Sequence, residues 1–182
     1  MGKIMKIGSV DIGLFGHHRY NSPQTNERNI ELPLAKYFIW KYRNHITEIG
    51  AVTPYYYATN HIIIDMNDTH PLVNFREDAR GFDYTNRNIL SISTLEHIEK
   101  GYELFKRIIE TTSNYLITIP VNFNKPFDKK INRIKENRFF MRYKDTWELG
   151  GGFSKDYPYV PGRGATAIAV YTNLPEFYEA EL

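Results

Sequence analysis

Four short apolar runs, each closed by a turn or polar residue, most constrain the fold of this chain. They are HITEIG, HIIID, NILSIS and YLITIP, and they end at Gly50, Asp65, Ser93 and Pro120. Their apolar character is continuous rather than alternating, which is typical of strands buried on both faces in a parallel sheet. The sequence therefore predicts a three-layer α/β fold.

Helical spacing of apolar residues predicts two helices. Between the last two runs lies GYELFKRIIETTS, which places Tyr102, Phe105, Ile108 and Ile109 on one face. A strand, a helix and a second strand in this order predict a right-handed crossover between parallel strands. A second helix is expected over residues 32–42, where Pro33 is tolerated in the first turn.

The two ends of the chain differ from this pattern. RFFMRY and ATAIAVYT are short strand candidates near the C-terminus, and they predict an antiparallel pair that completes a mostly parallel sheet. Residues 1–29 contain several glycines with little periodicity and are expected to form an irregular arm, with a short strand at its start and a role as a lid. The length of 182 residues predicts a single domain, 1–182.

Composition excludes several classes of protein. The 23 basic and 21 acidic side chains leave a formal charge of +2, which argues against nucleic acid as a partner. Without cysteine there is no disulfide, thiolate metal site or cysteine nucleophile. No run resembles a signal peptide or reaches membrane-spanning length, so we expect a cytoplasmic protein that does not bind membranes.

Polar residues follow the predicted strands at the sheet edge where ligands of parallel sheets bind. A carboxylate at Asp65 can accept both hydroxyls of a ribose, while Gly50 lets a ligand approach the backbone. Equally, Asp65 can cap the turn that follows its strand. The run EIGAVTP contains no GxGxxG, which argues against a pyrophosphate loop and hence against NAD or FAD.

Five segments in order resemble the motifs of class I S-adenosylmethionine-dependent methyltransferases. They are TEIGAVTPYY, IIIDMN, REDARGFDY, NILSISTLEHIEKG and YLITIP, and with their flanks they cover roughly residues 25–171. The most specific piece, ILSISTLEHI, is similar to the motif at the fourth strand of that family. The resemblance implies a Rossmann-like methyltransferase fold and S-adenosyl-L-methionine as the cofactor.

The resemblance also implies roles for individual residues. Glu48, Gly50 and Ala51 would form the cofactor loop at the methionine part, Asp65 would bind the ribose with Met66 beside the adenine, and Asp78 and Ala79 would lie near the adenine amino group. Ser93 and Thr94 would lie beneath the methionine part of the cofactor, and Glu96 and His97 would face the acceptor. The chain departs from the GxGxG of the family at Val52 and Pro54.

Several residues are candidates for the acceptor side. His97 is the candidate general base, with Glu96 orienting it or the acceptor, although both residues could simply start a helix. The predicted acceptor contacts are His17, His18, Arg19 and Tyr20 of the arm, Tyr56 after the cofactor loop, and Asn122 and Asn124, which could instead shape a turn. No metal site is expected, because the adjacent histidines have no ligand-spaced partners.

These observations predict a methyltransferase that acts on a small polar acceptor, such as a sugar or a nucleotide-linked compound. The alternative is a noncatalytic Rossmann-like module that binds a nucleoside or a protein. A weaker alternative is a hydrolase or lyase that uses the same pocket. The shortened elements also suggest a homo-oligomer in which a second copy supplies a wall of the cleft.

Overall fold

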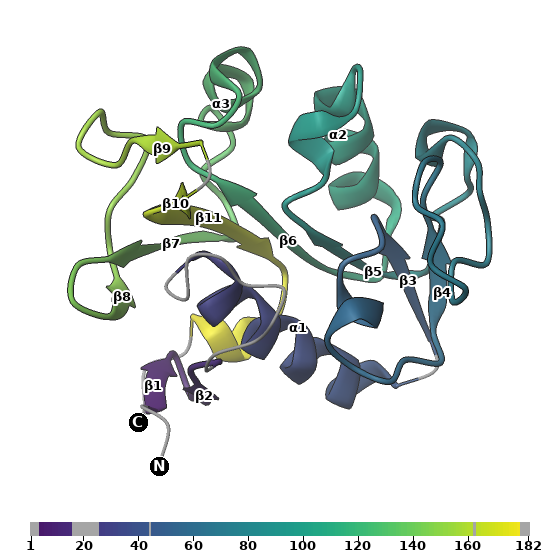
Figure 1. The fold of residues 1–182 in the computed structure, drawn as a ribbon, viewed down its shortest axis with the longest axis horizontal. Helices are drawn as coiled ribbons and strands as arrows, with labels where there is room; N and C mark the ends of the chain where they lie inside the picture. The colour runs from purple at the N-terminus through teal and green to yellow at the C-terminus, as the bar shows by residue number, and fades with distance from the viewer. Residues whose placement is uncertain (1–3, 16–25, 44, 162, 179–182) are drawn as a thin grey trace.

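A seven-stranded sheet forms the centre of the computed structural model, which describes residues 4–15, 26–43, 45–161 and 163–178 (Figure 1). Its strands run in the order β4-β3-β5-β6-β11-β7-β8. Their bounds are β3 Ile46–Ile49, β4 Ile62–Ile64, β5 Asn88–Ile92, β6 Asn114–Pro120, β7 Arg138–Tyr143, β8 Trp147–Leu149 and β11 Ala167–Thr172. The strands β4, β3, β5 and β6 pair in parallel, and β11 pairs antiparallel with both β6 and β7. The predicted Rossmann-like α/β architecture, mostly parallel with an antiparallel pair near the C-terminus, is confirmed.

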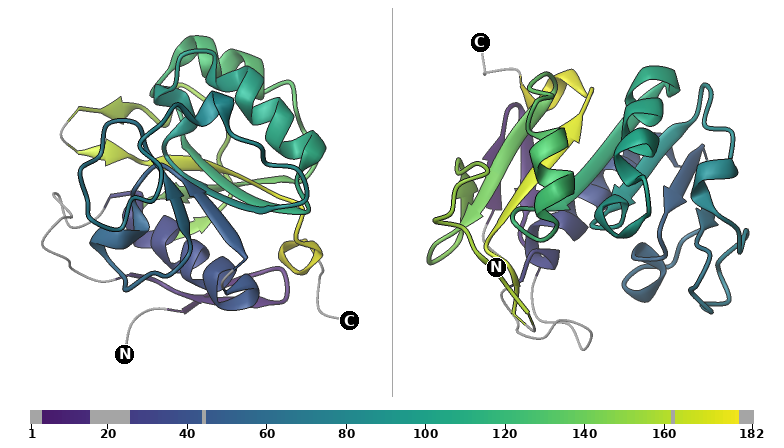
Figure 2. Two further views of the ribbon diagram at one scale, coloured as in Figure 1. Left: turned by 90° about the vertical axis from the view of Figure 1, so that its right-hand side faces the viewer. Right: turned by 90° about the horizontal axis from the view of Figure 1, so that it is seen from above.

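Helices cover both faces of this sheet (Figure 2, left). Helix α1, Arg28–Tyr42, packs on one face, and α2, Gly101–Thr111, and α3, Lys125–Ile131, pack on the other. Neighbouring residues of one strand contribute to different cores: Ile89 packs with the α2 side and Leu90 with the α1 side. Burial on both faces explains why the apolar runs are continuous.

Helix α1 begins at Arg28, before the predicted residue 32, and its start is joined to the N-terminal segment. Proline at position 33 has no N–H to donate to the carbonyl of Asn29. That carbonyl instead accepts from the backbone N–H of Phe15 at 2.8 Å, and the Asn29 side chain donates back to the Phe15 carbonyl at 2.6 Å. The proline therefore leaves an acceptor that fixes where the N-terminal segment meets the helix.

The first residues form a hairpin, β1 Ile4–Ile7 and β2 Val10–Gly13, whose side chains Ile7, Val10 and Ile12 are buried in the α1 core. The short strand expected at the start is therefore present. The expectation of an irregular arm over 1–29 is wrong for this hairpin and for the first turn of α1. The hairpin is held by core packing, and the lid prediction depends on residues 16–25, which lie outside the described residues. His17, His18, Arg19 and Tyr20 lie outside the described residues.

The sequence patterns missed several short elements. These are β8, a two-stranded ribbon of β9 Tyr159–Val160 and β10 Gly164–Ala165, and four 3₁₀ turns: η1 Thr53–Tyr55, η2 Ala79–Gly81, η3 Leu95–His97 and η4 Pro175–Phe177. Between β3 and β4 the described chain contains only η1, so this crossover has no α-helix. Among the described residues, no helix has the length and apolar character needed to cross a membrane.

Asp128 on α3 generates a prediction about pH and stability. Its side chain is buried, and neither carboxylate oxygen makes a hydrogen bond of normal geometry with another described residue. Burial raises the pKa of Asp128 to about 7, against an ordinary value of 3.8. Between these values the folded state holds the proton more tightly than the unfolded state, so this residue makes the protein less stable as pH rises from about 4 to about 7.

We therefore expect Asp128→Asn to raise the free energy of unfolding at pH 8, by about 1 kcal/mol or more. The gain should be smaller at pH 5. Urea denaturation at both pH values measures this, with Asp145→Asn at an exposed turn as the control. An equal effect of Asp128→Asn at the two pH values would contradict the prediction.

Candidate functional site

A cavity of about 680 Å³ lies at the carboxyl ends of β3, β4 and β5. After β3 the chain adds β4 on one side of it and then adds β5 on the other side, so the strand order reverses at β3. Such a switch point is where open α/β sheets bind ligands. The cavity is lined by Ile49, Gly50, Ile64, Asp65, Met66, Asn67, Asp68, Asp78, Ala79, Arg80, Ser93, Thr94, His97, Ile98 and Glu99.

Most of the predicted cofactor residues meet in this cavity although they are distant in the sequence. Gly50, Asp65, Met66, Asp78, Ala79, Ser93 and Thr94 line it, as does the candidate base His97. Of that cofactor set, Glu48 and Ala51 are not among the lining residues. The placement brings the residues together, and their roles toward a ligand stay predictions.

Gly50 is required by a close approach of the chain to itself. Its φ is 86°, and a Cβ at this position would lie 2.2 Å from Oγ1 of Thr94. The Thr94 hydroxyl donates to the Ile92 carbonyl at 2.9 Å, which holds the side chain in place. The loops after β3 and β5 therefore touch at a point where only glycine fits.

Asp65 caps the turn that follows β4. Its Oδ1 accepts from the backbone N–H groups of Asn67 and Asp68, both at 2.9 Å, and its Oδ2 accepts from the N–H of Ala51 at 3.0 Å. The capping interpretation thus describes what this carboxylate does in the structure, while the side chain also borders the cavity. Ala51 donates to Asp65 and turns its N–H away from a ligand.

Glu48 stabilises the loop after β3 by accepting hydrogen bonds from it. Its buried carboxylate accepts from the N–H of Val52 at 3.1 Å, from the N–H of Thr53 at 2.8 Å and from the Thr53 hydroxyl, and it lies 2.7 Å from Nε2 of His61. This network fixes the short crossover. His61 and Thr53 carry no motif, and the sequence analysis missed them.

Arg80 pairs with Asp78, and both residues line the cavity. The Arg80 Nη2 lies 2.6 Å from Oδ2 of Asp78, and Oδ1 of Asp78 accepts from the Arg80 backbone N–H at 2.9 Å, which caps the turn η2. These hydrogen bonds lower the pKa of Asp78 to about 2. Asp78 is therefore an anion whose main partner is Arg80, a cavity residue that the sequence analysis did not single out.

His97 and Glu96 share the 3₁₀ turn η3 and face different environments. The His97 side chain is 56% exposed, stands against the Phe123 ring at 4.5 Å, and lines the cavity. Burial of part of its ring and the nearby Arg28 lower the pKa of His97, so the imidazole is neutral at pH 7. Glu96 is only 2% exposed, and burial raises its pKa well above the ordinary value. The alternative in which the two residues start an α-helix is not what the structure shows, because they end the 3₁₀ turn η3 and α2 begins at Gly101.

The two candidate asparagines shape local structure. The Asn122 side chain donates to the carbonyls of Ser154 and Tyr157 at 2.7 and 2.8 Å. Asn124 accepts from the N–H of Phe127 at 3.2 Å, which caps α3, and donates to the Glu96 carbonyl at 2.7 Å. Neither residue lines the cavity, nor does Tyr56, whose ring packs edge-on against Phe15 at 5.9 Å.

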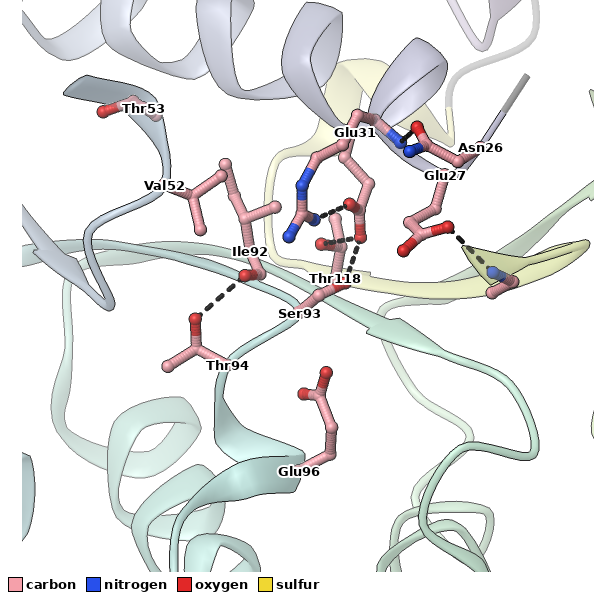
Figure 3. Close-up of polar contacts among 12 residues, drawn as sticks. Asn26, Glu27, Glu31, Val52, Thr53, Ile92, Ser93, Thr94, Glu96 and Thr118 are labelled. Atoms are coloured by element: carbon pink, nitrogen blue, oxygen red, sulfur yellow. Dashed lines mark hydrogen bonds and ion pairs between the residues drawn. The ribbon is translucent and has the colours of Figure 1, made fainter. Parts of the chain in front are cut away.

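Three acidic residues, two of them missed by the sequence analysis, lie near Ser93, which lines the cavity (Figure 3). We call Glu27, Glu31 and Glu96 the carboxyl cluster. Glu31 Oε1 accepts from the hydroxyls of Ser93 at 2.5 Å and Thr118 at 2.6 Å, and Oε2 pairs with Arg28. The first two glutamates lie at the start of α1, far in sequence from the strand ends, so no spacing rule linked them to the site.

Comparisons with known proteins assign no family. No family model matches, and no curated protein matches. Two solved structures are similar. One is titled "Structure of the Pnkp1/Rnl/Hen1 RNA repair complex", with 16% identity and a TM-score of 0.41. The other is titled "Structure of Pnkp1/Rnl/Hen1 complex", with 13% identity and a TM-score of 0.38.

The alignments with these structures cover 84% and 75% of this chain, but only 42% and 40% of the matched chains. This chain thus spans less than half the length of either. Likeness at these values supports no functional argument, so the function is argued from the site and from the sequence motifs that supply its residues.

The contact between Gly50 and Thr94 generates a prediction. Gly50→Ala should lower the free energy of unfolding by about 2–4 kcal/mol, because of the positive φ and the overlap with Thr94. In a Thr94→Gly background the same change should cost less, since the overlapping atoms are gone. Urea denaturation of the parent, the two single variants and the double variant measures both effects.

Gly81→Ala is the matched control for this cycle. Its added Cβ meets no atom within 4 Å, so it should change stability by about 0.5 kcal/mol or less. A Gly50→Ala protein as stable as the control would show that the two loops do not touch as described.

Proposed function

We propose that this protein binds S-adenosylmethionine in the switch-point cavity and transfers its methyl group to a small polar acceptor, such as a sugar or a nucleotide-linked compound. The observation that carries the proposal is the convergence of Gly50, Asp65, Ser93 and Thr94 on one cavity of about 680 Å³. This volume lies within the usual range for small-molecule sites. The resemblance to class I methyltransferases in the segments that supply these residues supports it.

The cavity offers a distinct environment for each part of such a ligand. At the β4 end, Asp65 has lone pairs left for a ribose after accepting its backbone bonds, and exposed Met66 provides an apolar surface for a base. At the β3 and β5 end, Gly50 leaves the backbone open beside Ser93 and Thr94. The adenosine would lie toward β4 and the sulfonium toward β5.

His97 is the residue best placed to move a proton. The sulfonium supplies an activated methyl group, and its displacement depends mainly on how the acceptor is positioned. A hydroxyl acceptor must also lose its proton as the new bond forms. The neutral imidazole of His97 borders the same cavity and can accept that proton at pH 7.

A noncatalytic nucleoside-binding protein is the second candidate. A specific observation favours it: Glu48 is wholly engaged with its own loop, and Asp65 already accepts three backbone N–H groups. Hydrogen bonds of this kind hold the loop so that the cavity stays open for a nucleoside. In this candidate neither Glu48 nor Asp65 takes part in catalysis. The two candidates share the binding site and differ in the chemistry.

Calorimetric titration with S-adenosylmethionine and S-adenosylhomocysteine tests the proposal. Both should bind, and Asp65→Ala should weaken binding by about tenfold or more, since hydrogen bonds to a charged group are among the stronger polar contacts. Met66→Ala should weaken binding less, and it leaves the loop hydrogen bonds intact. Asp145→Ala, at an exposed turn, is the control that should bind as the parent does.

Three outcomes separate the candidates. No binding of either compound at about 1 mM would contradict the proposal. Binding without methyl transfer to any sugar or nucleotide offered would favour the noncatalytic candidate. Breakdown of S-adenosylmethionine incubated with the protein alone would instead indicate a hydrolase or lyase. Thermal unfolding of Asp65→Ala is measured in parallel, because this residue also caps a turn.

A further inference from the structure

One carboxyl group of the carboxyl cluster, that of Glu96, has no hydrogen-bond partner among the described residues. Glu96 is 2% exposed, and both of its carboxyl oxygens are without a hydrogen-bond partner in the described part of the chain. In Figure 3 its carboxyl group points away from η3, toward Ser93, Thr118 and Glu31. A buried polar group left without partners destabilises the folded state, and it does so more strongly when it is charged. Contacts among the described residues therefore do not explain why position 96 is a glutamate.

The other two members of the cluster are held firmly in place. Glu31 is fully buried and accepts from Ser93, Thr118 and Arg28. Glu27 accepts the N–H of Ala165 at 2.8 Å, and a Cβ on the neighbouring Gly164 would lie 2.1 Å from the same Glu27 oxygen. The chain thus brings acidic groups from α1 and η3 together in a fixed arrangement.

The charges of this arrangement define what it can bind. In the part of the chain that the structure describes, Arg28 supplies the one guanidinium beside these three carboxyl groups, so the surroundings favour a group that donates hydrogen bonds and carries positive charge. Among the described residues, no set of three or more His, Asp or Glu side chains has the arrangement of a metal site. An amino group, which donates two or three directed hydrogen bonds, suits these acceptors better than a metal ion.

The cluster is also connected to the switch-point cavity. Ser93 lines the cavity and donates to Glu31, while His97 lines the cavity and its Nε2 lies 3.7 Å from Oε1 of Glu96. Both connections lie at the β5 end, where the proposed function places the sulfonium. A group bound at Glu96 would therefore belong to a molecule next to the methyl donor.

We propose that the carboxyl cluster, with Glu96 as its open acceptor, binds an amino group of the acceptor substrate. The inference rests on the proposed function in identifying the ligand as the acceptor. It narrows the acceptor class to amine-bearing compounds, either an amino sugar or an aminated nucleobase, whose shared chemistry is an N–H₂ or ammonium group.

Paired probes that differ in the nitrogen group test the proposal. Glucosamine is compared with glucose, and cytidine with uridine, by calorimetric titration in the presence of saturating S-adenosylhomocysteine. The aminated member of at least one pair should bind about tenfold or more tightly than its partner. Discrimination within the sugar pair identifies an amino sugar as the acceptor, and discrimination within the nucleoside pair identifies an aminated base.

Two glutamate variants show whether Glu96 is responsible. Glu96→Gln should remove the preference for the aminated probe, while the exposed Glu110→Gln should keep it. Glu96→Met should leave the unfolding temperature unchanged or raise it, because an unpartnered buried carboxyl group is replaced by an apolar side chain of similar length. A purely structural Glu96 would give lower stability in Glu96→Met and no change in probe preference.

Equal binding within both pairs, or a preference that survives Glu96→Gln, would overturn the proposal. So would Glu96-dependent binding of Mn²⁺, which would make the cluster a metal site. The same titrations without S-adenosylhomocysteine separate this proposal from the broader one. A Glu96-dependent preference for amines in a protein that does not bind S-adenosylhomocysteine would retain the amine site and reject the methyltransferase.

Discussion

The buried carboxylate of Glu31 connects the layers of this protein at the edge where its cavity lies. It comes from the first turn of α1, and it accepts hydrogen bonds from Ser93 after β5 and Thr118 within β6. The backbone N–H of Ser93 also donates to the Thr118 carbonyl at 2.9 Å, and Ser93 has a φ of 43°. A non-glycine residue in this conformation needs such support. The Glu31 carboxylate and the backbone bond to Thr118 together hold Ser93 where the chain leaves β5, and Ser93 forms part of the cavity wall.

The loops around the cavity are stabilised by side chains that a ligand would otherwise use. Glu48 and Asp65 accept backbone N–H groups from the short crossover, which has Val52 and Pro54 where the methyltransferase family has glycines. A crossover without an α-helix buries little apolar surface, and buried hydrogen bonds to charged groups compensate for that loss. The cavity is therefore preformed, and its carboxylates serve the loop first.

The strands were predictable because burial on both faces leaves a continuous apolar run in the sequence. NILSIS and YLITIP became β5 and β6, and RFFMRY and ATAIAVYT became the antiparallel strands β7 and β11. The N-terminal hairpin was harder to predict, because its two strands have four residues each and are too short to show a clear periodic pattern. Its position depends on an acceptor that Pro33 leaves free on Asn29, and periodicity does not reveal such a contact.

By itself, the sequence determined the fold class and the strand ends at which Gly50, Asp65, Ser93 and His97 stand, because periodicity and turn residues act locally. Only the tertiary structure decided which way each side chain turns at that edge. Glu48 accepts hydrogen bonds from its own loop, and Arg80 pairs with Asp78. Glu96 is buried near Glu27 and Glu31, which lie far from it in the sequence. Such partners come from other elements of the fold. Their distances and burial, which set the pKa values and the unfilled hydrogen bonds, exist only after the layers have packed.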